Sequence, residues 1–461
     1  MLCLGQQRSL LLSDKEFIAS LLERIAALEA LVLRQAEEIA ALKDELAWYK
    51  SNRNSHNSHL PPSRDLHKPT PAKPKRKKSS RNPGGQHGHK ANRLEKVEAP
   101  HVTVVHDVSA CQHCGEDLRN AYGEVIRTAQ IFDIPKIELR VTEHHKVMKG
   151  CPKCGQHTTS ELPGTLDFID AQYGDNLKSL VSYLSSRQYC SEGRVAECVH
   201  ILTGARISTG FVWDTIHQKA QQLQAVYDQI RDKIRQSPVV GSDETGCRIN
   251  GKRNWMWVWC TPQFSWLTVS DNRGYATVMD TLGDREQPFT LVSDCYAAQL
   301  KTPTADKQIC LAHLLRECDG LHERYRSNWA LRLKTQLEEI IRLTRMDTLT
   351  PQHVRRTEEE LLSILKRVRG RAHEKVEVFR DRLYKLRAHI TTCLRNRLVP
   401  PTNNMSERAL RSTKVKMRVS SQFRTSHGAQ DYAILRSIID TAILQGRHPF
   451  DALVRPEIVL I

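Results

Sequence analysis

The sequence predicts a multidomain α+β protein, and three observations support this fold class. A heptad repeat runs through residues 15–50, two Cys-x-x-Cys pairs occur at 111–114 and 151–154, and strand-like segments alternate with turns across 238–294. The hydrophobic period changes from one region to the next, so each region needs its own packing partner. A chain of 461 residues is also too long for one hydrophobic core. We therefore expect separate domains joined in series.

The heptad repeat predicts an N-terminal coiled coil at residues 15–50. β-Branched residues dominate one core position and leucine the other, a combination that favours a parallel two-stranded coil with Gln35 helping to set the register. The two positions hold Ile18, Ile25, Val32, Ile39 and Leu46, and Leu21, Leu28, Gln35, Leu42 and Tyr49. An amphipathic helix packing on its own protein is the alternative. The regularity of the repeat favours self-association, and we expect a homo-oligomer.

Residues 51–95 are predicted to be a basic linker. Pro, Gly, Ser and Asn dominate this segment, and its few apolar residues cannot form a core. Between Arg64 and Arg93 there are ten Lys or Arg residues and one acid. The densest run is Lys75, Arg76, Lys77 and Lys78. A solvated linker is one interpretation, and a linker that also contacts phosphates is the other; the sign of the charge favours phosphate contacts.

The composition of the whole chain favours a polyanionic partner. The sequence has 69 Lys and Arg residues against 52 Asp and Glu residues, for a formal net charge of +17. No apolar run approaches the roughly 18 residues of a membrane span. The first sixteen residues have too short an apolar region for a signal peptide, and no small-residue cleavage site follows. Thirteen cysteines in such a chain are expected to be reduced thiols and metal ligands.

The two Cys-x-x-Cys pairs predict a zinc-binding module at residues 100–160. Cys111, Cys114, Cys151 and Cys154 supply the four thiolates of one tetrahedral structural Zn²⁺, and a glycine follows each pair. The 36 residues between the pairs contain a hairpin-like alternation at Ile137, Leu139 and Val141, which suits a zinc ribbon. Redox-active pairs are the rival interpretation, and the nearby His113, His144 and His145 are alternative ligands.

Residues 165–235 are predicted to be helical and to contact DNA. Val195, Val199 and Leu202 share a helical face, a TGAR turn follows, and Ser208 is placed to cap a second helix. Helix, glycine-containing turn and helix form the pattern of a helix-turn-helix. An ordinary helical hairpin has the same pattern.

The segment 236–455 is predicted to be a ribonuclease H-like domain with a helical insertion at 320–395. VVGSDET, WMWVWC and FSWLTVS form three strands, GYATVMDTLG a helix and FTLVSD a fourth strand. In that fold the first and fourth strands lie side by side. Asp243 would end the first strand and Asp294 the fourth, so their carboxylates would converge, whereas Asp271 would lie away from the centre. Converging carboxylates repel unless cations lie between them, and their oxygens suit Mg²⁺.

The stretch PTNNMSERALRSTKVKMR, residues 401–418, contains a lone acid in a basic neighbourhood. Glu407 precedes Arg408, Arg411, Lys414 and Lys416, with no further acid before Arg424. Glu407 could belong to a capping box with Asn404 as the N-cap. We instead expect a third acid that completes a two-Mg²⁺ site for in-line displacement at phosphorus, with the four basic residues binding DNA phosphates.

Four sequence blocks carry a specific resemblance. SDET (242–245), SDCYAA (293–298), CLAHLLRE (310–317) and NNMSERALR (403–411) resemble, in the same order, the signature blocks of the insertion sequence 66 family transposases. The heptads, the basic linker and the paired cysteines resemble that family's N-terminal half. The resemblance implies a bacterial DDE transposase of the cytoplasm and nucleoid, with Asp243, Asp294 and Glu407 matching the catalytic triad. It also implies element-encoded accessory proteins as partners.

A Cys-x-x-His pair follows the second aspartate. Cys310 and His313 are similar to a motif in several DDE transposases, and we interpret them as support for the site rather than as a second zinc site. A buried thiol and a hydrogen-bonded imidazole are the plain alternative. The chain departs from the family at Cys295, Gln299 and Thr402, where Gly, Tyr and Asp are usual.

Taken together, these patterns predict an enzyme that cuts the ends of a mobile element and joins its 3′-hydroxyls to target DNA, using two Mg²⁺ ions. A noncatalytic zinc-dependent DNA-binding regulator is the alternative from another class. A nuclease of the same fold, which cuts without joining, is the nearer alternative.

Overall fold

The computed structural model describes residues 17–39, 42, 94–164, 166, 169–283, 285–366 and 372–460. The chain divides into two compact units. The first comprises Met1–Thr70, Tyr173–Glu192 and Gly210–Ile461, and the second comprises Pro71–Gln172 and Gly193–Thr209. Within the described part of the chain, no helix is both long and apolar enough to cross a membrane.

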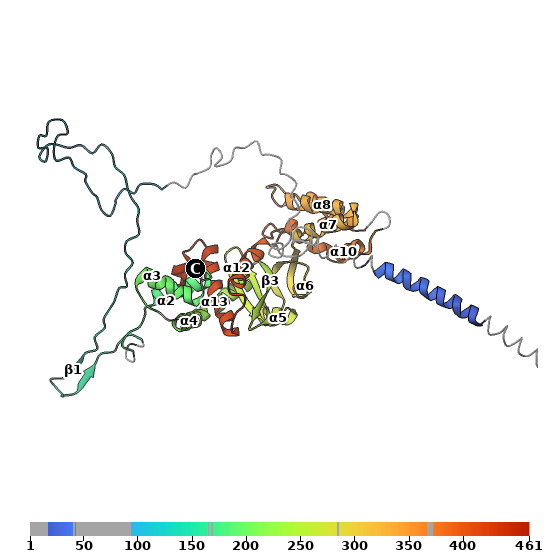
Figure 1. Ribbon diagram of the computed structural model, residues 1–461, viewed down its shortest axis with the longest axis horizontal. Coiled ribbons are helices and arrows are strands. Elements are labelled where there is room, and N and C mark those ends of the chain that lie inside the picture. Colours follow the sequence, from blue (N-terminus) through green and yellow to red (C-terminus); the bar gives the residue numbers. More distant parts are fainter. Residues whose placement is uncertain are drawn as a thin grey trace, which may run out of the picture. The chain divides into compact units, whose positions relative to one another are not determined.

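An N-terminal helix covers the described residues 17–39 of the predicted coiled coil (Figure 1). Its heptad side chains are exposed: Ile25 is 50% and Val32 63% accessible. An apolar seam left open to water is what a coiled coil covers with a second helix, but self-association stays a prediction. Leu46, Tyr49 and the linker residues Lys75, Arg76, Lys77 and Lys78 lie outside the described residues.

The described residues of the second unit form a small hairpin and the helix α3. β1 (Met148–Gly150) pairs antiparallel with β2 (His157–Thr159), and α3 spans Glu192–Thr203. The strand expected at Ile137, Leu139 and Val141 is wrong: these residues form no strand, and Val141 is 88% exposed. Alternation defines a strand only where a neighbouring strand pairs with it and a core receives one face, and neither condition is met along this segment.

A five-stranded mixed sheet lies at the centre of the first unit. The strands are β3 (Val239–Ile249), β4 (Lys252–Cys260), β5 (Ser265–Ser270), β6 (Gln287–Ser293) and β7 (Thr304–Ile309). Their spatial order is β5-β4-β3-β6-β7; β5, β4 and β3 are antiparallel neighbours, and β3, β6 and β7 are parallel. The predicted strand order, with α5 (Tyr275–Leu282) before the fourth strand, is confirmed. β7 and the short α6 (Ala297–Lys301) were not predicted from the sequence.

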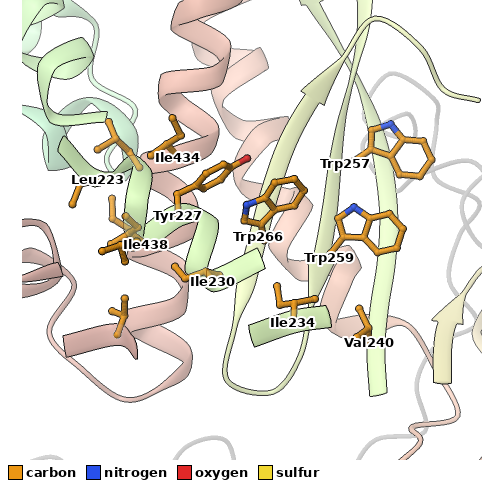
Figure 2. Close-up of a cluster of buried hydrophobic side chains, with 14 of the residues drawn as sticks. Leu223, Tyr227, Ile230, Ile234, Val240, Trp257, Trp259, Trp266, Ile434 and Ile438 are labelled. Atoms are coloured by element: carbon orange, nitrogen blue, oxygen red, sulfur yellow. The ribbon is translucent and has the colours of Figure 1, made fainter. Parts of the chain in front are cut away.

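Two long helices, α4 (Thr209–Arg235) and α13 (Ser426–Leu444), pack with this sheet. Figure 2 shows their contribution to the core: Tyr227 of α4 stacks on Trp266 of β5 with ring centroids 5.1 Å apart, and its hydroxyl donates to the carbonyl of Leu267 at 2.7 Å. α13 lies along the free edge of β5, where the Ser437 and Thr441 hydroxyls accept edge N–H groups at 2.8 and 3.1 Å. The edge strand is therefore covered rather than open to pairing with another chain.

The two helices expected of a helix-turn-helix are present as α3 and α4. Val195 and Val199 are fully buried, whereas Leu202, predicted on the same face, is 45% exposed. α4 is 27 residues long, and its buried hydrophobic residues from Ala220 to Ile234 belong to a core cluster that also contains residues of the sheet. Because α3 and α4 fall in different units, the helix-turn-helix stays a prediction.

A group of helices lies between β7 and α12 (Asn404–Ser420) in the sequence, and its buried cluster also includes Val239, Val292 and Ile309 of the sheet. It comprises α7 (Leu311–Tyr325), α8 (Asn328–Leu343), α9 (Pro351–Lys366), α10 (Glu374–Lys385), η2 (Arg387–His389) and α11 (Thr392–Arg395). Figure 1 shows α7, α8 and α10 lying together. Leu333, Leu337 and Leu361 of these helices are buried in one cluster. The helices begin earlier than expected, at Leu311.

Four further elements complete the first unit. α12 (Asn404–Ser420) packs against β3 and β4, and α2 (Asp175–Ser186) packs against α14 (Pro449–Val454). The chain continues into η3 (Pro456–Leu460). A close approach positions α12: a Cβ on Gly241 of β3 would lie 2.6 Å from the Ser406 hydroxyl.

Candidate active site

The two candidate aspartates lie at the same level on adjacent parallel strands. β3 pairs with β6 from Val239 to Gly241, opposite Thr290 to Val292. Continued by two residues, this register sets Asp243 opposite Asp294, which directly follows β6. The sequence predicted that Asp243 ends the first strand. This is wrong, because β3 stays paired with β4 as far as Ile249. The β3–β6 pairing, however, ends at Gly241 and Val292, so both aspartates lie just beyond it.

Strand alternation assigns neighbouring acids of β3 to opposite faces of the sheet. Cys247, of the same parity as Asp243, packs in a cluster with Leu410 of α12. Asp243 therefore faces α12, and Glu244 faces the other side. Burial raises the pKa of the Asp243 carboxyl well above its usual value, and the negative charges of Glu244, Asp294 and Glu407 add to this shift. Asp294 and Glu407 are thus each close enough to Asp243 for their charges to act on it.

Glu407 lies in the first turn of α12 and faces α7. Its Oε1 atom lies 3.3 Å from Nη2 of Arg316 and 3.7 Å from Nδ1 of His313. The alternative capping role of Glu407 does not match the observed contacts. The cap is Asn403 rather than Asn404, no side chain caps the helix, and the Asn403 N–H donates to Sγ of Cys310 at 3.2 Å. The Glu407 carboxylate is therefore directed away from the backbone of its own helix.

The Asn403 side chain also fixes the start of α12 to β3. Its amide donates to the carbonyl of Ser242 at 2.7 Å, and its Oδ1 atom accepts from the Ser406 hydroxyl at 2.6 Å. All these groups are buried. Hydrogen bonds of this kind hold the first turn of α12, and with it Glu407, next to the strand that carries Asp243.

The four basic residues predicted to bind phosphate have different surroundings. Arg408 and Arg411 are exposed on α12. Lys414 is partly buried, and burial lowers its pKa while the charges of Asp243 and Glu407 raise it. Lys416 lies instead near Glu192, and burial lowers its pKa as well. Lys414 is therefore the member of this set that faces the acids.

A buried acid, Glu244, and its partner Arg273 were not predicted from the sequence. The guanidinium of Arg273 contacts Glu244 at 2.6 Å and lies over the rings of Trp255 and Tyr296, 4.8 and 4.0 Å from their centroids. Burial raises the pKa of Glu244 to about 7, helped by the negative charge of Asp294. The signal was present in SDET, where the residue after Asp243 is a second acid on the opposite strand face.

Gln299, where the family usually has Tyr, contacts the buried acid Glu244. The Gln299 amide donates to the second carboxylate oxygen of Glu244 at 3.0 Å, and the Gln299 side chain is fully buried. The Asp294 carboxylate accepts from the Tyr296 N–H at 2.8 Å, which orients it at the end of β6.

The carboxylates fit divalent cations by their chemistry. Buried acids that raise one another's pKa form an oxygen-rich, negative site, and such a site favours a hard cation. Among the described residues, Cys310, His313 and Glu407 are the only three metal-ligand side chains whose ligand atoms all lie within 4.8 Å of one another. Asp243, Asp294 and Glu407 do not form so tight a group. A two-metal site does not require one, because its ions lie about 4 Å apart and separate the outer ligands further.

Each cysteine pair forms a turn suited to a metal thiolate. The Gly115 and Gly155 N–H groups donate to the carbonyls of Cys111 and Cys151, both at 2.9 Å, and both glycines have positive φ, +78° and +70°. Backbone N–H groups lower the pKa of the Cys111 and Cys151 thiols. The donors fit zinc, but in the described part of the chain the two pairs do not gather into one four-sulfur cluster.

The fold and the acids together are consistent with one class, the ribonuclease H-like proteins of the DDE type. The family model described as Transposase IS66 family matches residues 170–431, which is more than half of the chain. The chain therefore belongs to the IS66 family of DDE transposases, as the sequence blocks predicted. Family membership implies transposition, DNA binding and a divalent metal.

Two further family models match the N-terminal half. Residues 109–155 match the zinc-finger binding domain of transposase IS66, which supports zinc at the Cys pairs. Residues 16–95, the predicted coiled coil and linker, match a family of unknown function, DUF6444. Compared with curated protein sequences, the chain has no significant match.

Proposed function

We propose that this transposase cleaves the ends of its insertion sequence and joins the 3′-hydroxyls to target DNA by two-metal-ion phosphoryl transfer. The observation that supports it best is the level position of Asp243 and Asp294 on adjacent strands, with the charge of Glu407 acting on Asp243 from α12. These observations support a site in which three acids from distant parts of the sequence act together near the sheet centre.

In such a reaction, each group of residues would have a separate role. Bound divalent cations would supply Lewis acidity for the attacking and leaving oxygens. Asp243, Asp294 and Glu407 would hold these cations, because their oxygens repel one another without them. Lys414, which faces the acids, would contact the reacting phosphate. The exposed Arg408 and Arg411 would contact phosphates on either side of it.

The N-terminal half would serve binding and assembly. The coiled coil at 15–50 would pair protomers, which suits the bridging of two element ends. The zinc module would hold one structural Zn²⁺ through Cys111, Cys114, Cys151 and Cys154. The basic linker and the helix-turn-helix around 192–217 would contact DNA, and element-encoded accessory proteins would assist.

A strand-transfer assay with precut element ends, target DNA and Mg²⁺ tests the proposal. We expect joined product from wild type and none from Asp243→Asn, Asp294→Asn or Glu407→Gln, which keep side-chain size and remove charge. Asp271→Asn is the matched control, because Asp271 follows the edge strand β5 and is exposed. Joining by Glu407→Gln at the wild-type rate would contradict the assignment of the third acid.

The same assay separates the alternatives. Cleavage without joined product by the wild type would indicate a nuclease of the same fold. DNA binding that is unchanged by Asp243→Ala, with neither cleavage nor joining by the wild type, would indicate a noncatalytic regulator.

A further inference from the structure

The start of α7 and the start of α12 meet at one point in the first unit. The Leu311 N–H donates to the Pro401 carbonyl at 2.9 Å, and the Asn403 N–H donates to Sγ of Cys310 at 3.2 Å. Cys310 is the residue that precedes α7, and His313 lies in the first turn of that helix. Glu407, from the first turn of α12, is the third side chain at this junction.

These three side chains present three different ligand atoms to one volume. One atom each from Cys310, His313 and Glu407 lies within 4.8 Å of the other two. Cys310 is fully buried, while the His313 and Glu407 side chains are 13% and 27% exposed. The cluster is therefore closed on the sulfur side and open on the carboxylate side.

The ligand types point away from magnesium. Thiolate and imidazole ligands select zinc among the common divalent ions, whereas Mg²⁺ takes oxygen ligands. Three protein ligands with one open position are the usual set of a zinc ion that keeps access to solvent or substrate. Burial raises the pKa of the Cys310 thiol to about 11, and the backbone N–H groups of Asn403 and His313 oppose this shift. A bound zinc ion would displace the thiol proton.

The sequence favoured Cys310 and His313 as support for the site rather than as a second zinc site, but Glu407 adds a third ligand atom to this pair. We propose that Cys310, His313 and Glu407 bind a second Zn²⁺ ion, in addition to the one at the paired cysteines. The ion would link α7 to α12 and hold the Glu407 carboxylate through one oxygen, leaving the other oxygen for the catalytic site. Arg316, 3.3 Å from Oε1 of Glu407, would keep the carboxylate oriented. The zinc site is independent of the reaction, but its effect on Glu407 rests on the proposed function.

Metal content of the purified full-length protein tests the proposal without any measurement of activity. After dialysis against a weak chelator, we expect two equivalents of zinc in wild type and one in Cys310→Ala and in His313→Gln. The double variant Cys111→Ala/Cys114→Ala should also hold one equivalent, and adding Cys310→Ala should remove it. Cys318→Ala is the matched control, since Cys318 is another buried thiol of α7, and it should keep both.

Cobalt substitution checks the ligand directly. The cobalt-loaded Cys111→Ala/Cys114→Ala variant should show thiolate-to-cobalt absorption that disappears when Cys310→Ala is added. Circular dichroism and thermal unfolding of each variant establish that it is folded, and His313→Gln tests the site with the thiol intact. Equal zinc in wild type, Cys310→Ala and His313→Gln would overturn the proposal.

The two proposals fail separately. If Cys310→Ala keeps wild-type zinc but loses strand transfer, Cys310 and His313 position Glu407 by hydrogen bonding, and the second zinc site is refuted. If wild type holds two zinc ions but joins no DNA, the second zinc site stands and the proposed function falls.

Discussion

Replacing Gly241 by Ala should disturb the active site through a single added methyl group. Gly241 lies on β3, two residues before Asp243, and faces the first turn of α12. A Cβ at this position would lie 2.6 Å from the Ser406 hydroxyl, 3.0 Å from Oδ1 of Asn403 and 3.6 Å from Sγ of Cys260. Ser406 cannot swing away freely, because it donates to Asn403 at 2.6 Å and lies 3.2 Å from the Cys260 sulfur.

The added methyl must therefore push the first turn of α12 away from β3 or break the Asn403–Ser406 hydrogen bond. Overpacking a filled site costs about 1–3 kcal/mol of the free energy of unfolding. Glu407 follows Ser406 directly, so the same displacement moves the third acid. A shift of about 1 Å in catalytic geometry can cost on the order of 100-fold in rate. We expect Gly241→Ala to lower the joining rate by about 10- to 100-fold, more than its loss of stability explains.

Urea unfolding and the strand-transfer assay measure the two effects side by side. Gly246→Ala is the matched control: it lies on the same strand, and its added methyl would come no closer than 3.7 Å to Trp255. Gly241→Ala/Ser406→Ala should recover part of the lost joining rate, because the closest contact is removed. If Gly241→Ala unfolds and joins DNA like wild type, α12 is not held against β3 as described.

Three further predictions follow from the acids and the N-terminal helix. For Glu244, the folded-state pKa of about 7 lies above its usual value of 4.5, so the folded protein holds the extra proton and stability falls as pH rises between these values. Glu244→Gln should reduce this fall in the free energy of unfolding by a few kcal/mol, roughly in proportion to the pKa shift. Urea unfolding at pH 5 and pH 7 without divalent cations measures the fall, and an equal fall in both proteins would refute the prediction. Mg²⁺ at 100 times its Kd should stabilise wild type by about 2.7 kcal/mol in thermal unfolding and should not stabilise Asp243→Asn, whose metal-free form should itself be more stable than wild type; an equal response would exclude Asp243 as a ligand. Ile25→Asp with Val32→Asp should dissociate the protein in light scattering, whereas Leu33→Asp, on the same helix outside the two heptad positions, should leave the assembly intact; dissociation by all would indicate general helix loss.

Much of the fold could be predicted because its signals are local. The three tryptophans of WMWVWC alternate with other residues, this strand pairs with FSWLTVS as expected, and Trp257 and Trp259 fill the core. β7 was missed because TADKQI contains few apolar residues; its strand character comes from pairing with β6. The segment at Ile137, Leu139 and Val141 failed for the opposite reason, since it alternates but has no strand to pair with.

The candidate site, like the fold, could be predicted only in part from the sequence. The sequence by itself determined which acids, cysteines and basic residues are present and in what order, because chain order and strand periodicity are written in it. Only the tertiary structure decided that Asp243 and Asp294 lie opposite each other, just beyond the last β3–β6 pair. It also decided that Glu244 is buried against Arg273, and that Glu407 lies next to Cys310 and His313. The physical reason is that these relations depend on register between strands and on the packing of two helix starts, and residues far apart in the chain carry no local signal of either.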